Sequence, residues 1–141
     1  MMGIPGIRPI QSADHDAALR ILRQLRPTLN ATDFEARLAR QAALGYRLIG
    51  SFTPQLSGVL GMRATETLAR GHHLHVDDLV VDNPFRGQGL GRALLSFAEA
   101  EARRLGCVAV FLDSFENVLP FYQASGYAAH DSVLVKKSLA D

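Results

Sequence analysis

PFRGQGLGRA, residues 84–93, is the stretch that decides the fold of this chain. Three alternating glycines lie between two arginines in it: Arg86, Gly87, Gly89, Gly91 and Arg92. Glycine has no Cβ, so the backbone N–H groups of such a run can approach a ligand closely. An amphipathic pattern follows, and a helix that begins here adds unpaired N–H groups and the positive end of its dipole. The stretch therefore predicts an anion site, and the flanking arginines favour phosphate.

Length and composition predict one globular domain over residues 1–141, with 48% hydrophobic and 21% charged residues. The formal net charge of +1 argues against nucleic acid as a partner. No apolar run approaches the roughly 20 residues of a membrane span, so we expect no membrane partner. Residues 1–10 lack the basic region and apolar block of a signal peptide, which indicates a cytoplasmic protein.

Hydrophobic spacing predicts an α/β fold in the order β-α-α-β-β-β-α-β-α-β-β, a mixed sheet of about seven strands with about four helices on both faces. A first helix contains the apolar spacing 18–25 and stops before Pro27, and a second has Thr32 or Asp33 as its N-cap and closes near Gly45. The other two helices are expected at 89–105 and 117–124. The expected strands are 7–10, 46–52, 58–64, 73–81, 107–112, 127–131 and 133–138.

The chain resembles the GCN5-related N-acetyltransferase (GNAT) superfamily. Arg86 to Gly91 meets that family's Gln/Arg-x-x-Gly-x-Gly/Ala signature, Asp77 to Val81 precede it, and Phe121-Tyr122 and Gly126-Tyr127 follow. The resemblance covers roughly residues 46–138. Other glycine motifs fit poorly, because a dinucleotide fingerprint needs two residues before its last glycine and a phosphate loop needs Lys-Ser/Thr after it.

The resemblance implies a twisted, mostly antiparallel sheet and an enzyme that transfers acetyl from acetyl-CoA to a primary amine of a small molecule by direct transfer. A protein acetyltransferase and a non-catalytic CoA-binding module of the same fold are the alternatives. Two splayed strands would admit the pantetheine arm, and the glycine run would hold the pyrophosphate. The residues so assigned to the cofactor are Leu79, Val80, Val81, Arg86, Gly87, Gln88, Gly89, Leu90, Gly91 and Arg92.

Acetyl transfer to an amine needs a base and an acid. With an amine pKa near 10, only about one molecule in a thousand is free base at neutral pH, so a proton must be removed. The departing thiolate then benefits from a donor. The resemblance places Tyr122 beside the sulfur as that donor.

The base is expected on the strand 73–81. Strand alternation places His75 and Asp77 on one face and Asp78 on the other, and we favour Asp77 with His75 second. A bulge in this strand would exchange the faces and promote Asp78. We predict no metal site, because no carboxylate or cysteine cluster accompanies His72 and His73.

Asn117 departs from the family, whose asparagine lies seven residues before the tyrosine, where this chain has Phe115. Asn117 either still reaches CoA or caps the short helix. The acceptor site is expected around the first two helices, their loop and the second to fourth strands. Arg20, Arg63 and Glu66 either contribute to it or are surface charges, and we favour surface charges. Small relatives often dimerise, so a homodimer is one alternative, and the sequence leaves the oligomeric state open.

Overall fold

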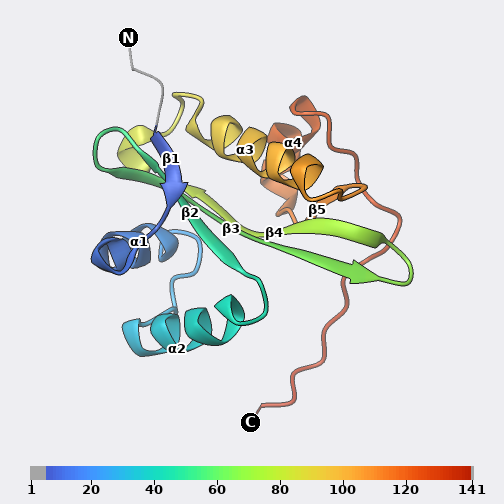
Figure 1. The fold of residues 1–141 in the computed structure, drawn as a ribbon, viewed down its shortest axis with the longest axis horizontal. Coiled ribbons are helices and arrows are strands. Elements are labelled where there is room, and N and C mark those ends of the chain that lie inside the picture. Colours follow the sequence, from blue (N-terminus) through green and yellow to red (C-terminus); the bar gives the residue numbers. More distant parts are fainter. Residues whose placement is uncertain (1–5, 141) are drawn as a thin grey trace.

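The computed structural model describes residues 6–140, so residues 1–5, half of the segment that led us to expect no signal peptide, lie outside it. Among the described residues, the chain forms five strands, four α-helices and three short 3-10 turns (Figure 1). In order, these are β1 (Gly6–Pro9), a turn (Ser12–Asp14), α1 (His15–Leu22), α2 (Ala31–Ala42), β2 (Arg47–Phe52), β3 (Leu56–Thr67), β4 (Gly71–Val81), a turn (Asn83–Phe85), α3 (Leu90–Arg104), β5 (Val110–Leu112), a turn (Glu116–Val118) and α4 (Leu119–Ala124).

One mixed sheet of order β1-β2-β3-β4-β5 forms the middle layer, antiparallel throughout except for the parallel pair β4–β5. Helices α1 and α2 cover one face and α3 covers the other (Figure 1). Each face has its own core. Ile21 of α1 and Phe34 of α2 pack with Val59 and Val80 on one side, and Leu94 of α3 packs with Leu60 and others on the opposite side. The expectation of a mixed, mostly antiparallel sheet with helices on both faces is confirmed.

A β-bulge interrupts the pairing of β3 with β4. Gly61 pairs with Asp78 but Met62 pairs with Val76, so Asp77 is the extra residue. Val76 packs in the α3 core and Val80 in the α1 core, although strict alternation would give them the same face. The bulge on which the alternative base assignment depended is therefore present, and it changes the phase of the strand at Asp77.

The last two expected strands are wrong. Residues 127–140 contain no strand, and the sheet of the described residues ends at the three-residue β5. The apolar residues on which that expectation rested are more than 80% exposed: Val133, Leu134 and Val135. The β-propensity of a segment becomes a strand only where a neighbour supplies hydrogen-bond partners, and here none of the described residues does so.

Two boundary expectations also need correction. The first helix ends at Leu22, followed by a turn through Leu25, rather than running to Arg26. The N-cap of α2 is Asn30, whose side chain accepts a 2.8 Å hydrogen bond from the Asp33 backbone N–H, and not Thr32 or Asp33. The asparagine is as good a cap as either, and the cap position moved because the helix begins earlier, at Ala31.

Candidate active site

The glycine run forms the connection into α3. Gly87 and Gly89 have φ of +79° and +83°, a left-handed conformation that residues with a Cβ rarely adopt. A Cβ built on either would meet nothing within 4 Å, so the space in front of this backbone is open. Gly91 differs, because a Cβ there would lie 3.3 Å from the Phe121 ring, which packs α4 against the first turn of α3. The predicted anion cradle therefore has open space at Gly87 and Gly89, and at Gly91 it packs against Phe121 of α4.

The sheet opens beside the cradle. β5 pairs with β4 only from Leu74 to Val76, so beyond that point β4 has no strand neighbour on its β5 side among residues 6–140. The Leu74 N–H points toward β5, since it donates to the Ala109 carbonyl, whereas the Asp82 N–H donates to Ser57 O on the β3 side. Successive residues of a strand direct their main-chain N–H and C=O groups to opposite neighbours. Because the Asp82 N–H points toward β3, the main-chain groups of Val80 also point toward β3, and those of Leu79 and Val81 point to the open side.

Two arginine side chains donate hydrogen bonds to backbone carbonyls along this open edge. Arg26 Nη2 donates to the Asp77 carbonyl over 3.0 Å, and Arg86 Nε donates to the Val81 carbonyl over 2.9 Å. Leu79 lies between these two positions with its main-chain groups on the open side. A pantetheine arm that adds to the edge as an extra strand would therefore meet Leu79 first.

Tyr122 belongs to α4 and lies at the wall of the cavity that the cradle and the open edge also line. The residue is 9% exposed, and its ring meets Phe121 and Tyr127 edge to face at 5.1 and 6.1 Å between centroids. Burial raises the pKa of the Tyr122 phenol above its usual value. A phenol with a raised pKa stays protonated at neutral pH and can donate.

Asp77 and Asp78 both line the cavity, but they have different partners. The Asp77 carboxylate accepts two hydrogen bonds from Arg63, at 2.9 and 3.2 Å. Asp78 accepts a 2.7 Å hydrogen bond from the Tyr46 hydroxyl, and its other oxygen lies 3.4 Å from Arg26 Nε. Burial and the Asp78 carboxylate raise the pKa of Tyr46 far above its usual value, so this phenol is a fixed donor.

His75 is close to the carboxylates of Asp77 and Asp113, but it does not line the cavity. Its Nε2 lies 3.8 Å from Asp77 and 3.5 Å from Asp113, and its side chain is 12% exposed. Burial is the largest cause that lowers its pKa below the usual 6.5, with opposing contributions from Asp77 and Asp113 and a further lowering by Arg63. His75 does not line the cavity, which separates it from the other catalytic candidates.

Two of the predicted cofactor residues also point elsewhere. Gln88 and Asn117 are exposed and do not line the cavity, unlike the other cofactor candidates. Asn117 lies in the 3-10 turn Glu116–Val118, and the N-cap of α4 is Val118. The capping role foreseen for Asn117 is therefore wrong, and its contact with CoA stays a prediction. Pro120 in the first turn of α4 fixes the late start of that helix.

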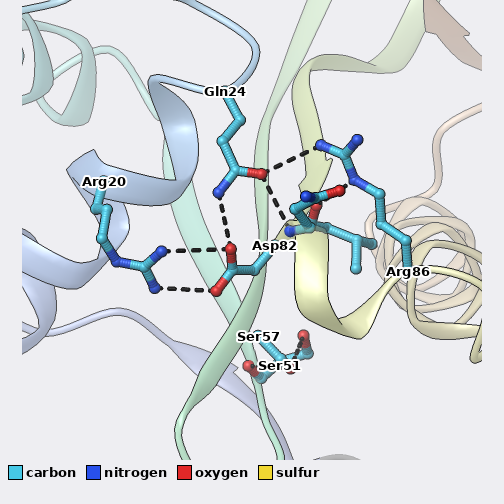
Figure 2. A network of polar contacts seen from close by, with 8 residues as sticks. Arg20, Gln24, Ser51, Ser57, Asp82 and Arg86 are labelled. Carbon is cyan, nitrogen blue, oxygen red and sulfur yellow. Dashed lines mark hydrogen bonds and ion pairs between the residues drawn. The ribbon is translucent and has the colours of Figure 1, made fainter.

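Arg20 and Arg63 are surface charges, with side chains that are 59% and 40% exposed, and each also pairs with a carboxylate in or directly after β4. Arg63 holds Asp77, and Arg20 holds the buried carboxylate Asp82 at the end of β4 (Figure 2). Arg20 and Asp82 are 62 residues apart, and no local pattern connects them. A charged residue directly after the apolar run Leu79–Val81 was the one available sign of a buried carboxylate.

The cradle, the open edge of β4, Tyr122 and the two aspartates line one cavity. It measures about 1350 Å³ and extends from the cradle (Gly87, Gly89, Gly91) past Tyr122 and the two aspartates to the loop after α1. Pockets for one small ligand usually measure about 300–1,000 Å³, so this volume has room for a long cofactor and a second small molecule together. Helix α2 and the loop 26–29 line the end away from the cradle.

Comparisons with known proteins agree with this geometry. The profile of the Acetyltransferase (GNAT) family matches residues 13–127. The glucosamine 6-phosphate N-acetyltransferase of Trypanosoma brucei brucei is 31% identical over 132 residues, which cover 89% of this chain and 90% of that protein. The blasticidin-S acetyltransferase of Streptomyces morookaense is 30% identical over 94% of this chain and 88% of its own length. The crystal structure of a Trypanosoma brucei acetyltransferase superposes with a TM-score of 0.81, at 27% identity, over 96% of this chain and all of the other.

The family profile extends over more than half of this chain, and the acetyltransferase of Trypanosoma brucei brucei aligns with 89% of it. The chain belongs to the GNAT family and is an acetyl-CoA-dependent N-acetyltransferase. None of the helices in residues 6–140 is both long and apolar enough to span a bilayer.

Proposed function

We propose that residues 1–141 act as a single domain that acetylates the primary amine of a small molecule by direct transfer from acetyl-CoA. One observation carries the proposal: the cradle, Tyr122 and the Asp77–Asp78 pair line one continuous cavity. Donor and acceptor can then bind together, so no acetylated enzyme residue is needed. Holding both reactants in one cavity supplies the proximity that such a transfer requires.

In this proposal Asp78 removes the proton from the acceptor amine and Tyr122 protonates the leaving sulfur. The bulge at Asp77 turns Asp78 to the face covered by α1 and α2, where the loop 26–29 lines the cavity. Asp77 has both oxygens in the Arg63 fork and serves to fix the strand. The amine nitrogen attacks the thioester carbon, the C–S bond breaks, and the thiolate takes the Tyr122 proton.

Glucosamine 6-phosphate is the acceptor we propose to test first. Five similar proteins carry the name of glucosamine 6-phosphate N-acetyltransferases, with 27–32% identity to this chain. Arg26 and Arg37 line the end of the cavity away from the cradle, and their side chains are 44% and 61% exposed. Guanidinium groups bind phosphate well, so this end suits an amine that carries an anionic group.

The test is acetyl-CoA turnover, followed as thiol release, over a panel of glucosamine 6-phosphate, glucosamine, blasticidin S and a lysine peptide. We expect kcat/KM to be highest for glucosamine 6-phosphate and lower for glucosamine, because glucosamine has no phosphate for Arg26 and Arg37 to bind. Turnover of the peptide alone would refute a small-molecule acceptor. Selective turnover of blasticidin S would support the second named activity among the relatives.

Three variants test the roles. Tyr122→Phe removes the proposed acid, and we expect kcat to fall about 100-fold with little change in CoA affinity. Asp78→Asn should lower kcat more than Asp77→Asn does, since the latter keeps the proposed base. Equal kcat values for wild type and Tyr122→Phe, in an assay limited by acetyl transfer, would remove the phenol from the mechanism.

The homodimer and the cytoplasmic location stay predictions. Sedimentation equilibrium tests the homodimer.

A further inference from the structure

Asp82 is a buried carboxylate that no step above uses. The residue is 2% exposed and follows Val81, where the chain leaves β4 and turns toward the cradle. An ionised carboxylate is costly to bury unless it is paired and hydrogen-bonded, and an apolar residue often serves stability as well. Its presence at this point therefore suggests a task in fixing the position of the loop.

Two side chains from the region of α1 pair with this carboxylate (Figure 2). Oδ1 accepts from Gln24 Nε2 over 2.7 Å and from Arg20 Nη1 over 3.3 Å. Oδ2 accepts from Arg20 Nη2 over 2.9 Å. The pKa of Asp82 lies below its usual value, chiefly because of the Arg20 hydrogen bond. Arg20, Gln24 and Asp82, hereafter the Asp82 clamp, thus form one charged and fully paired unit.

Gln24 connects this unit to the cradle. Its Oε1 accepts from the Asn83 backbone N–H over 3.1 Å and from Arg86 Nη2 over 3.2 Å. Arg86 also donates through Nε to the Val81 carbonyl over 2.9 Å. The Arg86 guanidinium is therefore held on two sides before any ligand arrives, and Arg86 lines the cavity beside Gly87. A side chain that is already ordered loses less conformational entropy on binding.

We propose that the Asp82 clamp positions Arg86 and the start of the cradle for the pyrophosphate of acetyl-CoA. Gln24 and Asp82 are positioning residues that act through Arg86 on cofactor affinity and leave the chemical step unchanged. The inference rests on the proposed placement of the pyrophosphate at residues 86–91. It assigns a function to Arg20, Gln24 and Asp82, none of which carries a step of the proposed chemistry.

Gln24→Met is the decisive variant, because Gln24 is exposed and its replacement leaves the core intact. We expect CoA affinity, measured by calorimetry, to fall about tenfold, which is the scale of one lost hydrogen bond to a charged group. Gln55→Met is the matched control, an exposed glutamine in the β2–β3 connection that does not line the cavity. It should bind CoA as wild type does. Equal CoA affinities for the two variants would overturn the clamp.

Two further measurements separate positioning from general stability. In an Arg86→Met background, Gln24→Met should cause no additional loss of CoA affinity, because its route to the cofactor is already gone. With S-acetylpantetheine, a donor that lacks the pyrophosphate, kcat/KM of Gln24→Met should stay within about twofold of wild type. Additive losses, or an equal loss with both donors, would refute action through Arg86.

The outcomes also distinguish this inference from the proposed function. Wild-type protein that fails to bind CoA would refute the cofactor site itself. Wild-type protein that binds CoA, with unchanged binding by Gln24→Met, would refute the clamp alone. Asp82→Asn is a second variant, expected to weaken CoA binding further, and circular dichroism establishes that it is folded before its affinity is compared.

Discussion

Gly61→Ala tests whether the bulge, Tyr46 and Asp78 form one unit. A Cβ built at Gly61 would overlap the Tyr46 hydroxyl oxygen and lie 2.6 Å from Cζ and 2.8 Å from Asp78 Oδ2. Tyr46 is 8% exposed and its hydroxyl donates to Asp78, so the ring can move aside only by giving up that hydrogen bond. The methyl group therefore has to break the 2.7 Å hydrogen bond from Tyr46 to Asp78 or displace β4.

The expected cost follows from two terms. Adding a methyl group to a packed site costs about 1–3 kcal/mol, and losing a hydrogen bond to a charged group costs about 1.5–3 kcal/mol. Together these remove roughly 2.5–6 kcal/mol from the free energy of unfolding, a large part of the usual 5–15 kcal/mol. For a chain of this size we expect the melting temperature to fall by about 10 °C or more.

Urea and thermal unfolding, followed by circular dichroism, measure this loss. Gly6→Ala is the matched control, since a Cβ there meets its nearest atom, the Phe52 carbonyl oxygen, at 3.8 Å. It should change stability by less than about 0.5 kcal/mol. A melting temperature of Gly61→Ala close to that of the control would refute the packing argument. The kcat of the folded variant is a second readout, expected to fall because Asp78 loses its fixed donor.

Two further predictions concern the cradle and His75. Gly89→Val should abolish CoA binding, because a β-branched residue is strained at φ +83° and its side chain would fill the open space in front of the backbone. Calorimetry measures the affinity, and retained micromolar binding would contradict the cradle. The pKa of His75 is lowered in the folded protein, so below about pH 6.5 the unfolded chain takes up the proton more readily and stability falls as the pH drops. His75→Gln should lose less stability between pH 7.5 and pH 5 than wild type does, as measured by urea unfolding, and equal losses would count against a buried neutral imidazole.

The cradle and α3 were predictable from sequence because their causes are local. Positive φ at Gly87 and Gly89 follows from residue type, and α3 extends over Leu90–Arg104 where the apolar spacing placed a helix at 89–105. For the cradle and α3, the signal and the structure belong to the same short segment. Tyr122 was placed by the family resemblance, and it lines the same cavity as the cradle.

The features that sequence reasoning missed depend on residues far apart in the chain. The Arg20–Asp82 pair joins α1 to the end of β4, and the Arg63–Asp77 pair joins β3 to β4. Each of these charges reads as a surface residue in its own segment, and only the folded arrangement supplies its partner. The two absent C-terminal strands show the reverse error, since Val133 to Val135 have strand propensity but no neighbour among residues 6–140.

The β-bulge at Asp77 depends both on the local alternation of β4 and on its pairing with β3, and it bears on the choice of the base. Alternation along β4 predicts that Asp77 and Asp78 point to opposite faces, which left one of them for the cleft. The register shift opposite Gly61 and Met62 brings both to the cavity, and their partners then make them unequal. Asp77 gives both oxygens to Arg63, whereas Asp78 accepts from a phenol whose high pKa prevents it from giving up its proton. Asp78 also pairs with Arg26 through its other oxygen at 3.4 Å, so the proposal of Asp78 as the base rests on position: the bulge turns it to the face where the loop 26–29 lines the cavity.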